Sequence, residues 1–166
     1  EIIELTKTIN NLIYTSHMRS EGDRLLESIE EVIYIGKIAS IHVHISHIKS
    51  AWRRNWSKID EVIKMIDLAR NNGLKITCDR YPYIASSTDL DVLLPVELYE
   101  SDLSKEVERL RDDDVKQLIR EELIKRHGDY SFLDNVIISS VSNDKNRWME
   151  GRSISEIASI ENVEPF

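Results

Sequence analysis

The feature that most constrains the fold is a regular alternation of short apolar segments and longer amphipathic ones in the first half of the chain. The apolar segments have the length and side-chain alternation typical of strands, and they are residues 12–15, 41–45 and 74–77. The segments between them repeat apolar residues at helical spacing, and they are residues 23–37 and 59–70. A strand–helix–strand–helix–strand order with connections of this length predicts neighbouring parallel strands of an α/β fold.

Two of these candidate strands are followed by histidines that lie thirty positions apart, His17 and His47. This interval is about one strand–helix–strand period, so both side chains are expected at the same end of neighbouring strands. Imidazole is a good zinc ligand, and strand ends hold ligands with little ordering cost. A hydrogen-bonded structural role is the alternative for either histidine. Two histidines at equivalent positions strengthen the case for metal ligation, and the structural role stays open beside it.

The alternation of side chains along a strand assigns the histidines to faces of the sheet. His47 shares its parity with Val43 and Ile45, and we expect this set to point inward, toward the mouth of a barrel. On the first strand, His17 shares its parity with Ile13 and Thr15, and it is likewise expected to point inward. His42 and His44 have the opposite parity from His47 and are expected to face the helix layer.

The pattern changes after the third candidate strand. A loop containing two prolines precedes a charged helical stretch, which the acidic run at residues 112–114 divides into two helices. A fourth strand and a short helix with a capping box, Ser153 and Glu156, are predicted near the end of the chain. The segments are a helix end at residues 2–9, the loop at 81–95, the helical stretch at 103–127, the strand at 135–141 and the helix at 153–160.

Composition excludes several classes of partner. The length of 166 residues suits one domain, and the formal net charge of −8 argues against a nucleic-acid backbone, which needs clustered cations. The single cysteine cannot form an internal disulfide and predicts a reducing cytoplasm. Neither a membrane-spanning apolar run nor a signal peptide is visible, so we expect no membrane partner.

Four short motifs in one order resemble a known family. They are residues 17–21 (HMRSE), 45–49 (ISHIK), 55–58 (NWSK) and 79–88 (DRYPYIASST). In sequence and spacing they resemble the N-acyl-D-amino-acid deacylases, or D-aminoacylases, of the amidohydrolase superfamily. Residues 151–158 (GRSISEIA) are similar to a later segment of that family.

The resemblance implies an α/β fold that is part of a (β/α)₈ TIM barrel, about strands five to seven with their helices, plus a mainly helical insertion. We expect partial-barrel units at residues 1–96 that carry the two histidine ligands. The helical insertion would occupy residues 97–134, and residues 135–166 would hold a strand and helix leading back to the barrel. Because a complete barrel needs eight strands and roughly 250 residues, the chain is expected to be an internal fragment.

The resemblance also implies the site residues. His17 and His47 would be metal ligands for zinc, with one or two ions in the full-length enzyme and weak or absent binding in the fragment. Lys49, Tyr81 and Ser87 would contact the substrate carboxylate or its surroundings, since a free carboxylate needs a cation and hydroxyl donors. Without the resemblance, Lys49 would be interpreted as a solvated surface lysine and Tyr81 as loop packing.

Neighbouring residues are expected to have supporting roles. Arg19 and Glu21 are predicted to organise the loop as an ion pair, without a catalytic role. Asp79 is expected to support a ligand or to cap a helix. Cys78 is predicted to be a small buried residue, because the cysteine ligand of the family would lie upstream of this chain.

The expected activity is hydrolysis of the amide bond of small-molecule N-acyl-D-amino acids to a D-amino acid and a carboxylate. The family's first-strand histidine pair and its catalytic aspartate have no match here, and the aspartate is expected C-terminal to the chain. The fragment alone is therefore expected to be inactive, and its open sheet edges favour self-association. Two alternatives remain open: a cyclic-amide hydrolase resembling dihydroorotases or hydantoinases, and a non-catalytic interaction domain built on residues 103–127.

Overall fold

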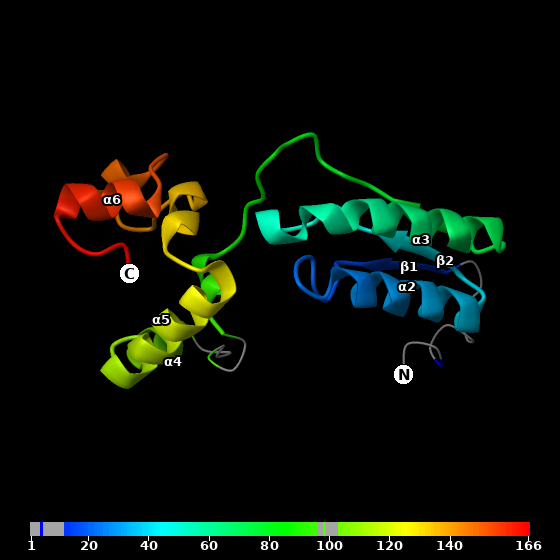
Figure 1. Ribbon diagram of the computed structural model, residues 1–166, viewed down its shortest axis with the longest axis horizontal. Helices are drawn as coiled ribbons and strands as arrows, with labels where there is room; N and C mark the ends of the chain where they lie inside the picture. The colour runs from blue at the N-terminus through cyan, green and yellow to red at the C-terminus, as the bar shows by residue number, and fades with distance from the viewer. Residues whose placement is uncertain (1–3, 5–11, 96–97, 99–102) are drawn as a thin grey trace. The chain divides into compact units, whose positions relative to one another are not determined.

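The computed structural model describes residues 4, 12–95, 98 and 103–166. The helix end predicted at residues 2–9 lies outside this set except for residue 4. The chain divides into two compact units, residues 1–84 and residues 85–166. Figure 1 shows the elements of each unit.

The first unit contains a three-stranded parallel sheet in the order β1-β2-β3. The strands are β1 (Ile13–Ser16), β2 (His42–Ile45) and β3 (Ile76–Cys78). Two helices connect them, α2 (Leu25–Ala39) and α3 (Ile59–Asn71). The mixed α/β class and the parallel order predicted from the alternation are confirmed, and the observed bounds differ from the predicted ones by a few residues.

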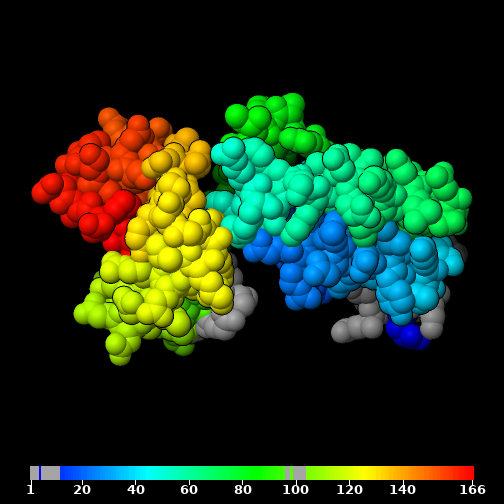
Figure 2. Space-filling model, viewed as in Figure 1, coloured from blue at the N-terminus to red at the C-terminus, as the bar shows by residue number. Residues whose placement is uncertain are grey.

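Both helices pack on the same face of the sheet. Val43 and Ile45 of β2 are fully buried, and they belong to one apolar cluster with residues of α2 and α3. The helices also contact each other, and Figure 2 shows their atoms adjoining along the surface of the unit. Gly36 permits the close approach of α2, because a Cβ built there would lie 2.8 Å from Val43 Cγ1.

The second unit is helical in its described part. Its α-helices are α4 (Leu103–Arg109), α5 (Asp113–His127) and α6 (Ile154–Glu161). Asp112 caps α5 by accepting hydrogen bonds from the backbone N–H groups of Asp114 and Val115, which confirms the break between two helices. The predicted capping box of Ser153 and Glu156 is also present.

The fourth strand predicted at residues 135–141 is wrong. Residues Ser131–Asn135 form a short 3₁₀ helix, and Ile137 then makes one isolated antiparallel bridge with Ser153. Ile137 is 60% exposed, so the apolar segment around it does not form a buried strand. Apolar composition predicts a strand only where a neighbouring strand supplies backbone partners along its length. Across the described part of the chain, no helix is both long enough and apolar enough to traverse a bilayer.

Candidate metal centre

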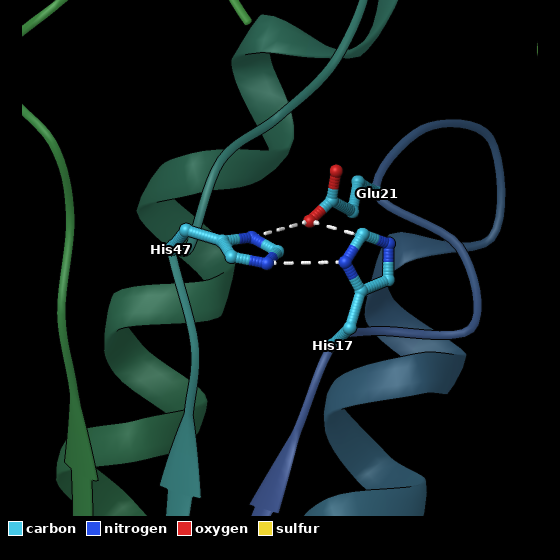
Figure 3. Close-up of side chains that lie close together, drawn as sticks. All are labelled: His17, Glu21 and His47. Atoms are coloured by element: carbon cyan, nitrogen blue, oxygen red, sulfur yellow. Dashed lines mark hydrogen bonds and ion pairs between the residues drawn. The ribbon is translucent and has the colours of Figure 1, made fainter. Parts of the chain in front are cut away.

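Three side chains that could hold a metal ion meet at the carboxyl end of the sheet. His17 follows β1 directly, Glu21 lies in the loop between β1 and α2, and His47 follows β2. Figure 3 shows the two imidazoles facing each other, with the Glu21 carboxylate beside both rings. Ligand atoms from the three residues all lie within 4.8 Å of one another.

The distance between the two facing imidazole nitrogens fits a shared divalent metal. His17 Nδ1 is 3.1 Å from His47 Nε2, and tetrahedral zinc with bonds of about 2.0–2.1 Å would place two ligand nitrogens about 3.3 Å apart. Glu21 Oε1 is 3.0 Å from His47 Nδ1 and 3.9 Å from His17 Nε2. The side chain of His17 is 68% exposed and that of Glu21 is 17% exposed, so the group is open to solvent on the His17 side.

The predicted facing of the histidines on the second strand is wrong. Val43 and Ile45 point into the helix-side core, which leaves His42 and His44 on the opposite face of the sheet. There both rings lie within hydrogen-bond distance of Thr77 Oγ1, at 2.9 and 2.8 Å. Burial is the main cause that lowers the pKa of His42.

His47 reaches the metal group because the alternation ends with the strand. Its φ of 41° lies in the left-handed region, which non-glycine residues adopt rarely. This turn changes the direction of the side chain from the one that strand parity with Val43 and Ile45 would give. His17 and His47 therefore do come together as predicted. The cause is the left-handed turn at His47 and not the alternation of side chains along the strand.

Asp79 supports the turn at His47. Its Oδ1 accepts a hydrogen bond from the His47 backbone N–H at 2.6 Å, and its Oδ2 lies 2.7 Å from His44 Nε2. The hydrogen bond with His44, followed by the one with the His47 backbone, lowers the pKa of the Asp79 carboxyl. This arrangement matches the supporting role expected for Asp79.

The predicted ion pair between Arg19 and Glu21 is wrong. Arg19 instead contacts Glu31 of α2 through two hydrogen bonds of 3.1 and 2.8 Å. Glu21 turns toward Lys49, whose Nζ lies 2.6 Å from its Oε1. Sequence reasoning therefore missed Glu21 as a member of the metal group, although its position four residues after His17 is a signal that could have found it.

Lys49 lies next to the metal group. Its Nζ is 2.7 Å from His47 Nδ1 and 5.5 Å from the centre of the Tyr81 ring. The structure thus brings together Lys49 and Tyr81, two of the three predicted substrate contacts. Ser87 is exposed and belongs to the second unit, and its part in the site stays a prediction.

The tautomer of His47 determines which nitrogen is available to a metal. If Nδ1 accepts from Lys49, the ring proton is on Nε2, which then cannot ligate. If Nδ1 donates to Glu21 instead, Nε2 has a free lone pair directed at His17 Nδ1. Carboxylate–histidine pairs fix this second tautomer in metal sites.

The burial predicted for Cys78 is wrong. Ile76 is the buried residue of β3, while Cys78 at the end of the strand is exposed. β3 lies at the edge of the three-stranded sheet, so its last residue is not covered as a central strand would be. Cys78 is outside the metal group.

Comparisons with known proteins follow the same motifs. No protein-family model matches the chain. An N-acyl-D-glutamate deacylase of Alcaligenes xylosoxydans xylosoxydans is 36% identical over 83 residues, which are 50% of this chain and 16% of that protein. A D-aminoacylase of the same organism is 35% identical over 92 residues, covering 54% of this chain and 19% of that protein. The chain thus matches less than a fifth of the length of these relatives.

Solved structures share the fold. The N-acyl-D-glutamate deacylase of Bordetella bronchiseptica, crystallised with zinc and a phosphonate that mimics the tetrahedral intermediate, superposes with a TM-score of 0.65. Identity is 22%, and the match covers 99% of this chain and 28% of that one. A D-aminoacylase described as defining a novel subset of amidohydrolases gives a TM-score of 0.56 at 23% identity, over 92% of this chain and 24% of that one. Together with the curated relatives, these matches confirm the resemblance to the N-acyl-D-amino-acid deacylases.

Proposed function

We propose that this chain is part of a zinc-dependent N-acyl-D-amino-acid deacylase, which hydrolyses the amide bond of its substrate to a D-amino acid and a carboxylate. The observation that carries the proposal is the group of His17, Glu21 and His47 at the carboxyl end of parallel strands, with Lys49 beside it. We further propose that the three strands are about strands five to seven of a (β/α)₈ barrel, whose catalytic groups lie at that end.

In this proposal His17 and His47 hold the metal. A zinc ion bound there would supply Lewis-acid polarisation of the amide carbonyl and a nucleophilic water at neutral pH. His17 offers Nδ1 and His47 offers Nε2, the two nitrogens that face each other at 3.1 Å. Glu21 accepts the Nδ1 proton of His47, which keeps Nε2 free for the ion and orients the ring.

Lys49 is suited to the substrate carboxylate. Its ammonium group has three N–H donors, and with His47 donating to Glu21, only one of them is needed for Glu21. The other two can donate to the α-carboxylate that every N-acyl-D-amino acid carries. We propose that Tyr81, whose ring centre lies 5.5 Å from Lys49 Nζ, packs beside that carboxylate. We propose Ser87 as a further donor to the substrate.

The proposed site is incomplete within this chain. Catalytic zinc normally has three protein ligands, and a general base must take the proton of the attacking water and pass it to the leaving amine. We propose that the base is an aspartate C-terminal to this chain. The 166-residue chain by itself is accordingly expected to give no turnover. The domain division at residues 1–96, 97–134 and 135–166 remains part of this proposal.

The test is hydrolysis by a protein that extends this chain on both sides to the length of its relatives. We expect release of free D-amino acid from N-acetyl-D-glutamate, N-acetyl-D-aspartate or N-acetyl-D-leucine, which stops on removal of zinc and does not occur with the L enantiomers. Lys49→Met should raise KM at least tenfold, while Lys37→Met, at the end of α2, should behave as the wild type. Metal-independent turnover, or equal rates with both enantiomers, would contradict the proposal.

A further inference from the structure

A polar cluster joins the loop after β1 to the loop after β2. It includes the motif at residues 55–58, which the proposed chemistry does not use. Asn55 is at its centre and is only 2% exposed. The cluster, which we call the loop clamp, consists of Asp23, Arg54, Asn55 and Lys58.

The Asn55 side chain connects the two loops directly. Its Nδ2 donates to Asp23 Oδ1 at 3.0 Å and to the Ala51 carbonyl at 2.9 Å. Its Oδ1 accepts from Lys58 Nζ at 2.8 Å. Both amide protons and the amide oxygen are thus used, and no side chain of other shape or polarity could replace all three contacts.

Two cations donate hydrogen bonds to Asp23 within the loop clamp. Arg54 donates two hydrogen bonds to the Asp23 carboxylate, at 2.8 and 2.9 Å, in the bidentate geometry that fixes orientation. Lys58 Nζ donates to the Asp23 carbonyl at 2.7 Å.

In both loops, residues that the loop clamp contacts are close in sequence to residues of the metal group or of Lys49 beside it. Asp23 is two residues after Glu21, and Ala51 is two residues after Lys49. The Ala51 N–H also donates to the Glu21 carbonyl at 2.7 Å. Asn55 therefore holds the two backbone segments from which Glu21 and Lys49 project, and these side chains meet at 2.6 Å.

We propose that the loop clamp is a positioning device for the metal group: Asn55 and its partners set the distance between Glu21 and His47, and metal affinity depends on them. This rests on the proposed function, because it assumes that His17 and His47 bind a metal and that Glu21 orients His47. A purely stabilising network is the alternative, and buried polar networks often specify an arrangement more than they add stability.

The test compares Co²⁺ affinity with stability in the 166-residue chain. Asn55→Ala removes all three contacts, and Asn55→Asp keeps the shape but removes both donors. We expect each to weaken Co²⁺ binding at least tenfold, the usual effect of removing a group that orients a ligand. Val62→Ala, at a buried position of α3, is the control. It should lower the melting temperature at least as much as the Asn55 variants do, while its Co²⁺ affinity stays within twofold of the wild type.

A second readout needs no metal. Hydrogen exchange of the Ala51 amide should accelerate at least tenfold in the Asn55 variants and stay unchanged in Val62→Ala. Equal Co²⁺ affinity in the Asn55 variants and the wild type would overturn the proposal. Because a site with two histidine ligands is weak, Co²⁺ is titrated to excess. A wild type whose His17 and His47 do not respond even to excess Co²⁺ would instead overturn the proposed metal centre, and the Ala51 amide would still show whether the loop clamp ties the loops. If Asn55→Ala does not fold, Lys58→Met takes its place.

Discussion

At the scale of single residues, Glu21 contacts both a proposed metal ligand, His47, and a proposed substrate-binding residue, Lys49. One oxygen, Oε1, lies 2.6 Å from Lys49 Nζ and 3.0 Å from His47 Nδ1. The carboxylate therefore balances a cation and orients a ligand at once. The Glu21 side chain is only 17% exposed. Water therefore screens its interactions with Lys49 and His47 less than it would at the surface.

Glu21→Gln should weaken zinc binding by about 10–100-fold, because a neutral amide no longer accepts the His47 Nδ1 proton as a carboxylate does. Isothermal titration of the chain with zinc measures the change. Glu27→Gln, on the exposed first turn of α2, is the matched control and should bind zinc as the wild type does. Unchanged affinity in Glu21→Gln would show that Glu21 neither binds the metal nor orients His47.

The pairing of His17 with His47 could be predicted from the chain, since both residues follow apolar strands one unit apart. The directions of their side chains could not be predicted. The prediction assumes regular alternation along the strand, and His47, with a left-handed φ of 41°, departs from it. The position of Glu21, four residues after His17, marks it as a candidate, but its partner could not be predicted from the sequence. A loop carboxylate can pair with any nearby cation, and its choice of Lys49 over Arg19 depends on how the two loops close.

At the scale of elements, Gly36 allows α2 to pack closely against the sheet, because it has no side chain. A Cβ there would lie 2.8 Å from both Val43 Cγ1 and Leu74 Cδ1. Since a fully buried strand residue cannot move aside without disturbing its own packing, the helix and β2 fit only with glycine at this position.

Gly36→Ala should therefore destabilise the chain, by about 1–2 kcal/mol. Overpacking costs about 1–3 kcal/mol and is only partly offset by the gain of about 1 kcal/mol in helix propensity. Urea unfolding gives the free energy of unfolding, with Lys37→Ala on the next residue as the control that should change it little. A stability gain of about 1 kcal/mol in Gly36→Ala would contradict the close packing.

The contact between Arg19 and Glu31 ties the loop after β1 to α2 and should depend on pH. The hydrogen bond from Arg19 lowers the pKa of Glu31 more than burial raises it. The stabilisation is therefore fully present above the unfolded value of about 4.3 and is lost as pH falls through the lower folded pKa.

Glu31→Gln should thus lower the melting temperature at pH 7, and lower it less at pH 2.5. The loss at pH 7 should correspond to at most about 1 kcal/mol, because the pair is largely exposed. Thermal unfolding followed by circular dichroism at the two pH values measures it. A difference between wild type and variant that persists undiminished at pH 2.5 would indicate that the contact does not depend on the carboxylate charge.

At the scale of the whole molecule, the order of strands and helices in the first unit followed from the sequence because each element is set by its own period. The false strand at residues 135–141 shows the limit of that reasoning. Pairing depends on backbone partners elsewhere in the chain, and there Ile137 forms a bridge only with Ser153.

Within the described residues, β1 and β3 each pair with β2 alone. Unpaired strand edges are templates for a second chain, so we expect concentration-dependent self-association in sedimentation velocity. Ile13→Lys, on the edge strand β1, should reduce it. Ile63→Lys on α3 is the matched control, because both isoleucines are 52% exposed. A wild-type chain that stays monomeric at high concentration would contradict this expectation.

The central claim is that His17 and His47 form a metal centre, and a zinc titration followed by the ¹H–¹⁵N spectrum of the imidazole rings tests it most directly. The chain has five histidines, so each one not in the centre serves as an internal control. Because a site with two histidine ligands binds zinc weakly, zinc is titrated to excess, and we predict that the His17 and His47 rings shift first, with His17 bound through Nδ1 and His47 through Nε2. Unshifted His17 and His47 rings, or zinc-dependent shifts at His42 and His44 instead, would contradict the claim.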